Sequence, residues 1–295
     1  MTRIRTLTLL AACVLGAVSC SDSSAGGTGK LTVQLTDAPF PFSQVSRVDV
    51  FVVRIDAKSG ETDATEAADA TSMSGWTTLA TPNALINLLD LGSGKTTNLG
   101  EVTLATGTYR GFRLIIDPAQ SSVTLKDGTK PSIVWPSASR TGIKIVLDAP
   151  VSLTQNGSVM VVDFDVGRSF VMRGNSISQN GLLFKPVLRG TAVDITGSAS
   201  GSVHGDNATG PAIVGATVEV LKAGTLLTDT DDANIVASTT TDASGNFKFG
   251  FLLPGTYVLR ATPPTGTVYT AALLSGGLTI TTGHETSGLV VVLGR

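Results

Sequence analysis

The sequence predicts an all-β protein, with two β-sandwich domains in tandem after a lipoprotein signal peptide. Apolar and polar residues alternate with a period of two along most of the chain, as they do in half-buried strands. Turn-forming pairs separate these stretches, at Asp127-Gly128, Asn156-Gly157 and Asn180-Gly181. No segment carries a long apolar stripe of helical period. We therefore expect strands joined by tight turns over nearly the whole chain.

Length and composition narrow the classes of function. The chain has 295 residues, enough for two domains, and a formal net charge of only −2. With 42% hydrophobic and 15% charged residues it is too apolar to be disordered, and no basic block suggests a nucleic-acid partner. Only two His and two Cys are present, which disfavours most metal, thiol and histidine-base chemistry. These counts predict a binding or structural protein, not an enzyme, with no cofactor.

The first residues have the order of a secretion signal. Arg3 and Arg5 precede an apolar run, residues 7–18, that is too short to span a bilayer. The run ends in Ala17-Val18-Ser19-Cys20, which resembles the lipobox of bacterial lipoproteins. The resemblance implies removal of residues 1–19 and acylation of Cys20 with palmitate-like chains, which together anchor a protein stably in a membrane. The alternative is an ordinary secretory signal that is cut near Ser19.

A polar tether is expected to follow the anchor. Residues 20–29 are small and polar, which is typical of a flexible linker. Ser21 rather than Asp follows the lipidated cysteine, which favours the outer membrane over retention at the inner one. We therefore expect a lipid-anchored envelope protein, periplasmic or surface-exposed.

The first β-rich domain is expected over residues 30–195. The acidic stretch 56–75 breaks the alternation and predicts a long exposed loop, and short helices are expected only within 85–91 and 166–172. The expected strands are 31–35, 45–55, 76–79, 85–89, 98–104, 108–117, 122–125, 144–147, 159–164 and 182–195.

Eight stretches of this half carry a family resemblance. They are LTVQLTDAP (31–39), VSRVDVFVVRID (45–56), GWTTL (75–79), INLLDL (86–91), LGEVTLATGTYRGFRLIID (99–117), RTGIKI (140–145), VVDFDVGRSFV (161–171) and LLFKPVLRG (182–190). In this order and spacing they resemble the envelope domain of domain-of-unknown-function family 4382. The resemblance implies a secreted or lipid-anchored β-sandwich-like domain, and it implies no activity.

A hinge-like linker at residues 196–200 leads to a second domain, residues 201–295. Phe247, Phe249 and Phe251 are expected on one face of a strand, between turns at 242–245 and 253–255. These motifs resemble the carboxypeptidase regulatory-like domain over about residues 198–295. That resemblance implies a transthyretin-type sandwich of carbohydrate-binding-like fold, without peptidase activity.

Two loops contain enough oxygen ligands to be considered as metal sites. Asp229, Asp231, Asp232 and Asn234 form the denser cluster and are the best metal candidates of the chain. The alternative is a polar loop between strands, and the prediction is that no metal is bound. The loop that holds Asp63, Glu66 and Asp69 does not have the spacing of a calcium loop.

One pair of carboxylates could serve a glycosidase. Asp163 and Asp165 lie at i and i+2 and so point to the same side of a strand. The chain has only 5% aromatic residues to line a sugar cleft. We therefore expect Val162 and Phe164 to face the core and both Asp side chains to face solvent or Arg168.

The ligand-binding residues are otherwise unknown. Trp135 offers a face for sugar stacking, and Arg140, Lys144 and Asp37 could form a polar rim. The string Gly92–Thr96 resembles a phosphate-binding loop, but position 89 is Leu where the motif needs Gly, so we expect a turn.

The sequence thus predicts a non-enzymatic envelope lipoprotein that binds a carbohydrate or an envelope partner protein. The alternatives are a structural or adhesion spacer that acts through protein contacts and, less favoured, a carboxylate-based hydrolase.

Overall fold

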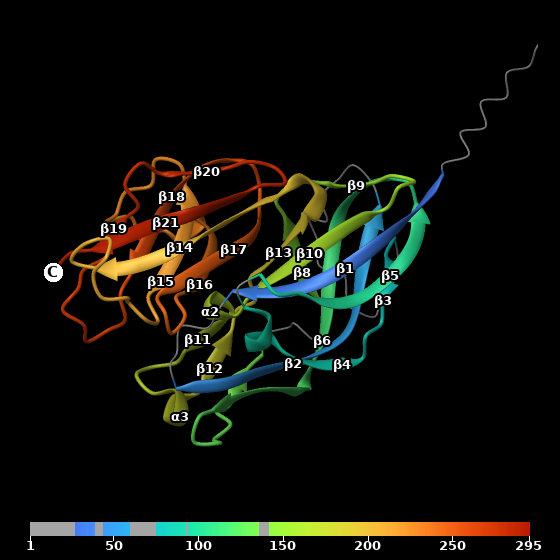
Figure 1. The fold of residues 1–295 in the computed structure, drawn as a ribbon. Helices are drawn as coiled ribbons and strands as arrows, with labels where there is room; N and C mark the ends of the chain where they lie inside the picture. The colour runs from blue at the N-terminus through green and yellow to red at the C-terminus, as the bar shows by residue number, and fades with distance from the viewer. Residues whose placement is uncertain (1–26, 39–43, 60–74, 93, 136–141) are drawn as a thin grey trace, which may run out of the picture.

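The computed structural model describes residues 27–38, 44–59, 75–92, 94–135 and 142–295. Two β units lie side by side, with β1 starting at one end of the molecule and the C-terminus at the other (Figure 1). The expected all-β class is confirmed. Cys20, Arg140 and the acidic residues 63, 66 and 69 lie outside the described residues.

The first unit is built on a ten-stranded sheet. Its main path is β3-β2-β6-β8-β13-β10-β1-β5, with β4 paired to β2 and β9 paired to β6. The strands are β1 (Thr28–Ala38), β2 (Val45–Ser59), β3 (Thr77–Ala80), β4 (Ala84–Asn87), β5 (Thr97–Ala105), β6 (Gly107–Leu125), β8 (Ile143–Leu147), β9 (Val151–Leu153), β10 (Ser158–Asp165) and β13 (Leu188–Ala192).

A small three-stranded sheet closes one side of this unit. It has the order β11-β12-β7, with β7 (Ile133–Val134), β11 (Phe170–Met172) and β12 (Leu182–Phe184). The short helices of the unit are η1 (Leu88–Leu91), α2 (Val166–Ser169), α3 (Ile177–Asn180) and η2 (Val193–Ile195).

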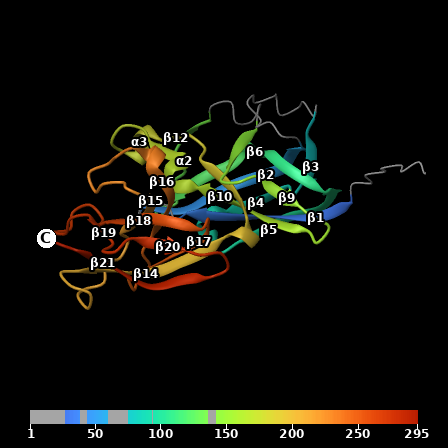
Figure 2. The same ribbon diagram turned by 90° about the horizontal axis from the view of Figure 1, so that it is seen from above.

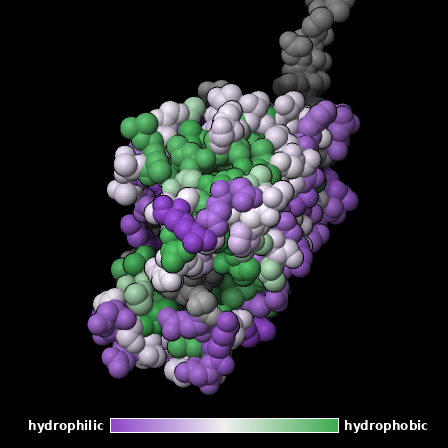
Figure 3. Space-filling model, turned by 60° about the vertical axis from the view of Figure 1, so that its left-hand side comes forward, coloured by the Kyte–Doolittle hydropathy of each residue, from purple (hydrophilic) through white to green (hydrophobic). Residues whose placement is uncertain are grey.

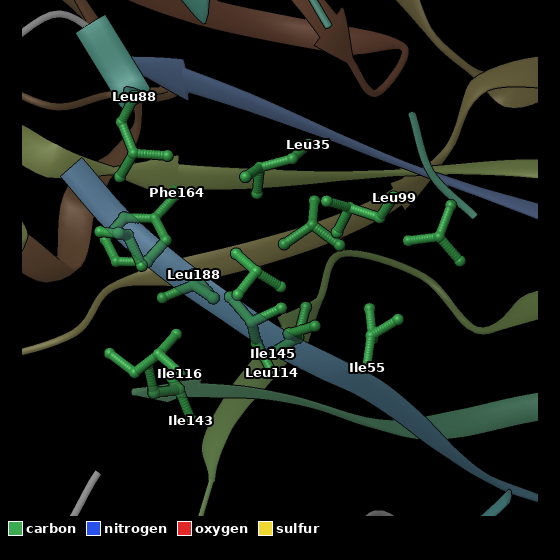
Figure 4. Close-up of a cluster of buried hydrophobic side chains, with 14 of the residues drawn as sticks. Leu35, Ile55, Leu88, Leu99, Leu114, Ile116, Ile143, Ile145, Phe164 and Leu188 are labelled. Carbon is green, nitrogen blue, oxygen red and sulfur yellow. The ribbon is translucent and has the colours of Figure 1, made fainter. Parts of the chain in front are cut away.

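Strands of both halves of the large sheet contribute to a single core. Leu35, Leu114 and Phe164, from β1, β6 and β10, point into it and are completely buried (Figure 4). Val162 is also completely buried, so the expected alternation along β10 is confirmed. The alternate, more polar residues of the large sheet therefore lie on its other face.

Several segments of the first unit differ from expectation. The strands expected at 108–117 and 122–125 form one continuous strand, β6. Residues 56–59 were assigned to a loop but continue β2, where Asp56 is buried and paired with Arg113 of β6 at 2.9 Å. Segment 182–195 was expected to be one strand but is divided between β12 and β13. Pro186 lies at the break, and proline has no N–H to donate to a strand pairing.

The second unit is a sandwich of two sheets, with strand orders β17-β14-β21 and β16-β15-β18-β19, β20 being paired to β18. Its first strand lies parallel to its last, with Ser198 opposite Glu285 and Gly205 opposite Leu293. The elements are β14 (Gly197–Gly205), β15 (Thr217–Lys222), η3 (Asp232–Asn234), β16 (Ile235–Thr240), β17 (Asn246–Leu252), β18 (Gly255–Thr262), β19 (Ala272–Leu273), β20 (Leu278–Ile280) and β21 (Glu285–Leu293).

The two units are joined without a flexible linker. β13 ends at Ala192, η2 follows, and β14 begins at Gly197, where it pairs with both β17 and β21. The expected linker at 196–200 was therefore wrong over 197–200, because the small residues there are hydrogen-bonded in a strand. Close approach explains one of them: a Cβ on Gly197 would lie 2.3 Å from the carbonyl oxygen of Thr281.

A bulge alters the expected face of β17. Gly250 and Phe251 of β17 lie opposite the single residue Ser198 of β14, and Phe251 has φ +56°. Phe247, Phe249 and Leu252 are buried, whereas Phe251 leaves the core face. The expectation that all three phenylalanines share one face was wrong at Phe251, because the extra residue reverses the alternation.

The outer surface is mixed in character. The two units also appear beside each other from above (Figure 2). On one face, hydrophobic residues gather in two areas separated by a band of hydrophilic ones (Figure 3). Among the described residues, no helix has the length and apolarity needed to cross a membrane.

Candidate functional site

A cavity of about 240 Å³ lies between the two units. From the first unit it is lined by residues of β1, β10 and β13, and from the second by residues of β15, β16, β17 and β18. Sites for ligands commonly lie between domains, and this volume is smaller than the roughly 300–1,000 Å³ of drug-sized sites. The cavity therefore suits a small ligand.

The first unit supplies a polar row of side chains across its sheet. Thr36 of β1 is opposite Asp163 of β10, and Asp163 is opposite Arg189 of β13. Thr191 lies two residues after Arg189 on the same face, since side chains in a strand alternate. These four residues all line the cavity, which thus lies over the polar face of the sheet.

The second unit covers this row with β16 and the bulge of β17. Ser238 and Thr239 of β16 line the cavity, together with Gly250 and Phe251 of the bulge. The left-handed backbone of Phe251 is uncommon for a residue with a bulky side chain. The bulge thus places Phe251 at the cavity instead of in the core of its own unit.

Three hydrogen bonds hold the units together beside the cavity. Arg189 Nη2 donates to the carbonyl oxygen of Ile235 at 2.7 Å, and Arg168 Nη2 donates to that of Asp232 at 3.2 Å. Ser238 Oγ donates to Asp165 Oδ2 at 3.3 Å. The charged donors come from the first unit, and the segment around η3 accepts them.

Carboxyl groups at this interface are hard to ionise. Burial and the nearby Asp165 carboxylate raise the pKa of Asp163 to about 7, although Arg189 acts in the opposite direction. Burial likewise raises the pKa of Asp165, against the hydrogen bond from the Arg168 backbone N–H, and the pKa of Asp148, against Arg189. Perturbed groups that line a cavity are typical of functional sites.

Two threonine hydroxyls at the cavity have no hydrogen-bond partner within the described ranges. Thr191 is 5% exposed and Thr239 is 2% exposed, and their Oγ1 atoms are completely enclosed. An enclosed hydroxyl without a partner is costly, so such atoms call for an explanation. A bound polar molecule would supply one.

The residues expected to form a polar rim are not brought together. Asp37 does line the cavity, 4% exposed, with Oδ1 accepting from the Val166 N–H at 3.1 Å. Lys144 is exposed on β8 and does not line it. Trp135 packs at the edge of the core, with its ring 4.7 Å from that of Phe184 and 6.0 Å from that of Phe170. Trp135 is therefore a packing residue here.

The candidate metal cluster forms a local hydrogen-bond network. Asp229 accepts from the Asp231 N–H at 3.0 Å and from Asn234 Nδ2 at 2.9 Å, and Asp231 accepts from the Ala233 N–H at 2.9 Å. In the described part of the chain, no three His, Cys, Asp or Glu residues are grouped as metal ligands. The network shapes η3, and η3 receives Arg168 from the first unit.

The carboxylate pair on β10 faces the other unit. Asp165 accepts from the Arg168 N–H at 2.9 Å and lies 3.8 Å from Arg168 Nη1, which agrees with the expected contact to Arg168. Asp163 lines the cavity, so the expectation of a solvent-facing side chain was wrong for it. The reason is that the second unit covers this face of β10.

Sequence reasoning missed Arg189, Thr191 and Thr239. Period-two alternation puts Arg189 and Thr191 on the non-core face of their strand, as it does Asp163. Nothing in the alternation tells whether that face meets solvent or another domain. An available signal was the short distance in sequence between β13 and the second domain.

Comparisons with known proteins place both halves of the chain. The model of the family DUF4382, "Domain of unknown function", matches residues 28–186, and that of the "Carboxypeptidase regulatory-like domain" matches residues 198–293. No curated protein matches the chain.

Solved structures similar to this chain include the TIE protein of Bacillus anthracis, the minor pilin GBS52 of Streptococcus agalactiae and a putative carbohydrate binding protein of Pseudomonas aeruginosa. Their identities are 10%, 12% and 17%, and their TM-scores are 0.26, 0.26 and 0.22. The matches cover 90%, 90% and 35% of this chain, and 35%, 96% and 90% of those chains, so this chain spans about a third of the first. At TM-scores below 0.5 these likenesses carry no functional argument.

The family match covers more than half of the chain, in the order that the sequence motifs indicated. The chain belongs to the DUF4382 family and carries a carboxypeptidase regulatory-like domain after its DUF4382 domain.

Proposed function

We propose that this protein is a non-enzymatic, lipid-anchored binding protein of the bacterial envelope, and that the cavity between its two units holds its ligand. The observation that carries the proposal is a pair of enclosed hydroxyls at that cavity, those of Thr191 and Thr239, which have no partners among the described residues. A small carbohydrate is the first ligand class to test, because its hydroxyls both donate and accept hydrogen bonds.

Binding is tested with the purified protein, without its signal peptide, by titration calorimetry against a panel of simple sugars. The variant Thr191→Val removes one cavity hydroxyl at nearly constant volume. Thr209→Val is a matched control, since Thr209 is exposed and does not line the cavity. We expect sugar binding that Thr191→Val weakens and Thr209→Val leaves unchanged. A panel without any binding sugar would contradict the carbohydrate assignment.

The anchoring part of the proposal rests on the lipobox-like residues 17–20. It is tested by intact mass and membrane fractionation of the full-length protein against Cys20→Ser. We expect a lipid-modified wild type in the outer membrane fraction and an unmodified variant. A mass difference no larger than that of the substitution itself, with both proteins soluble, would contradict the anchor.

A second candidate function is a structural or adhesion role through protein contacts. One observation favours it: Val134, Leu183 and Val171 are opposite one another across β7, β12 and β11, and each is at least 36% exposed. An apolar row across a sheet face is typical of a contact surface. Loss of self-association in Leu183→Asp, measured by sedimentation, would support this role, and a monomeric wild type would contradict contact with a second copy.

A further inference from the structure

On the side of the first unit, the cavity is lined by three carboxylates, Asp37, Asp148 and Asp163, and by one cation, Arg189. Arg189 Nη1 lies 3.7 Å from Asp148 Oδ1, and Arg168 Nη1 lies 3.8 Å from Asp165 Oδ2. Each guanidinium therefore lies beside one carboxylate and also donates to a carbonyl of the second unit. Asp163, on β10 opposite Arg189, forms no ion pair with any of the described residues.

Asp163 also has no hydrogen-bond partner in the part of the chain that is described. Its neighbour Asp165, by contrast, accepts from the Arg168 N–H and from Ser238. A carboxylate that has neither a hydrogen bond nor an ion pair is energetically unfavourable on a covered sheet face. Because Asp163 lines the cavity, a group that enters the cavity can reach it.

The threonine hydroxyls are a second, independent sign of an occupant. Thr191 comes from β13 of the first unit and Thr239 from β16 of the second, so they approach the cavity from different units. In a threonine, a 120° change of χ1 moves the hydroxyl to the position that the methyl group or the Cβ hydrogen held. Each hydroxyl can therefore turn toward a ligand with hydrogen-bonding groups.

We propose that the cavity binds a small polyhydroxyl ligand that carries one ammonium group, with the ammonium paired to Asp163 and hydroxyls bound by Thr191 and Thr239. This inference rests on the proposed function and names the class of its ligand. An ammonium supplies both the missing positive charge and the missing donors. A divalent metal ion suits the site poorly, since Ca²⁺ and Mg²⁺ need several oxygen ligands and no such group is present among the described residues.

Binding of an ammonium ligand should depend on pH. The pKa of Asp163 is raised to about 7, so below that pH the carboxyl is protonated and offers no charge to the ligand. Affinity should therefore increase as the pH rises through 7.

Other titratable and charged groups face Asp163 or its cavity. In the first unit they are Asp165, Arg189, Asp148, Arg168 and Asp37. In the second unit they are Lys222, Lys248 and Tyr257, all at the lining. Lys222 is exposed and Lys248 pairs with Glu285 at 3.4 Å, so both lysines belong to the rim.

The test compares 6-amino-6-deoxy-D-glucose with D-glucose, which has a hydroxyl in place of the ammonium. A primary alkyl amine stays protonated from pH 5.5 to 8, because its pKa is near the roughly 10.4 of lysine. Calorimetric titrations use the protein without its signal peptide, as wild type and as Asp163→Asn. At pH 8 we expect the amino sugar to bind wild type at least about tenfold more tightly than glucose, which is about 1.4 kcal/mol.

The advantage of the amino sugar should disappear in Asp163→Asn and should shrink at pH 5.5. Equal binding of the two sugars to wild type would overturn the ammonium assignment and leave the proposed sugar site intact. Retention of the full advantage in Asp163→Asn would also overturn it. If neither sugar binds, both this inference and the carbohydrate-binding function are contradicted. The protonated form of Asp163 is nearly isosteric with Asn, so the variant should fold.

Discussion

Arg189 of the first unit donates a hydrogen bond of 2.7 Å to the backbone carbonyl of Ile235 in the second. The same guanidinium lies 3.7 Å from Asp148 and acts on Asp163 at the cavity. One side chain therefore joins the two units and also sets the charge balance of the candidate site. Changes at this position should affect both.

Replacement of Arg189 with alanine should destabilise the protein by about 1.5–3 kcal/mol, because a charge-assisted hydrogen bond is lost and Asp148 loses its cation. Urea unfolding measures the change. Arg173→Ala is the control, since Arg173 is exposed and has no ion pair among the described residues. Equal stability of the two variants would mean that the contact to Ile235 contributes nothing.

Replacement of Asp163 with asparagine should raise stability at high pH only. The folded pKa of about 7 lies above the roughly 3.9 of an unperturbed Asp, so the folded protein holds a proton that the unfolded chain has released. The wild type therefore loses stability as the pH rises from about 4 to 7. We expect equal stability near pH 4 and a variant more stable by about 1–3 kcal/mol at pH 8, the full shift being reduced by solvent in the cavity.

Asp127→Asn serves as a control with the opposite sign. The Thr129 backbone N–H, 2.8 Å away, lowers the pKa of Asp127, so the ionised form stabilises the fold above pH 4. Its replacement should slightly destabilise the protein at pH 8. Unfolding curves of both variants at pH 4, 6 and 8 measure the two effects. If both replacements changed the free energy of unfolding in the same direction at pH 8, the assigned environment of Asp163 would be refuted.

Phe251→Gly should change the free energy of unfolding by less than about 1 kcal/mol. The φ of +56° is strained for Phe and easy for Gly, so relief of strain offsets the lost contacts of a partly exposed ring. Phe249→Ala, in contrast, empties part of the core and should cost about 3–5 kcal/mol. Thermal unfolding compares them, and similar losses in both would place Phe251 in the core after all.

Tyr109 and Tyr257 close equivalent corners in the two units. Each follows Gly-Thr after a turn and donates from Oη to a carbonyl four residues earlier, that of Ala105 at 2.9 Å or that of Leu253 at 2.8 Å. Burial raises the pKa of both phenols. Replacement of either by Phe should cost about 0.5–1.5 kcal/mol.

Tyr269→Phe is the comparison for these corners, because its hydroxyl donates only to the exposed Asp206 at 3.2 Å. In denaturant unfolding, Tyr269→Phe should lose less stability than either corner variant. A larger loss at Tyr269 than at Tyr109 and Tyr257 would be incompatible with structural corners.

Alternation along the strands was enough to predict the core. Val162 and Phe164 were expected inside and are completely buried, and the non-core side of β10 was assigned correctly to Asp163 and Asp165. The bulge at Phe251 was not predictable, because it depends on an extra residue opposite β14 and leaves the pattern of aromatic residues unchanged.

The sequence predicted only some of the residues that line the candidate site. Asp37 was named as part of a polar rim, and it does line the cavity. Arg189 and Thr239 come from different units, and only the packing of one domain on the other brings them together. The alternation of residues along one strand gives no information about contacts between domains. The acidic loop around Asp229 held the best metal candidates of the sequence, with a polar loop as the alternative, and its oxygens accept hydrogen bonds from their own loop.

The parallel pairing of β14 with β21 has a mechanical consequence. If tension acts between residues 197 and 293, it draws the two strands past each other along their length. Seven paired positions then resist together in shear, whereas an antiparallel hairpin pulled at its open end would unzip one pair at a time. The second unit should therefore resist extension when it is pulled between its first and last strands.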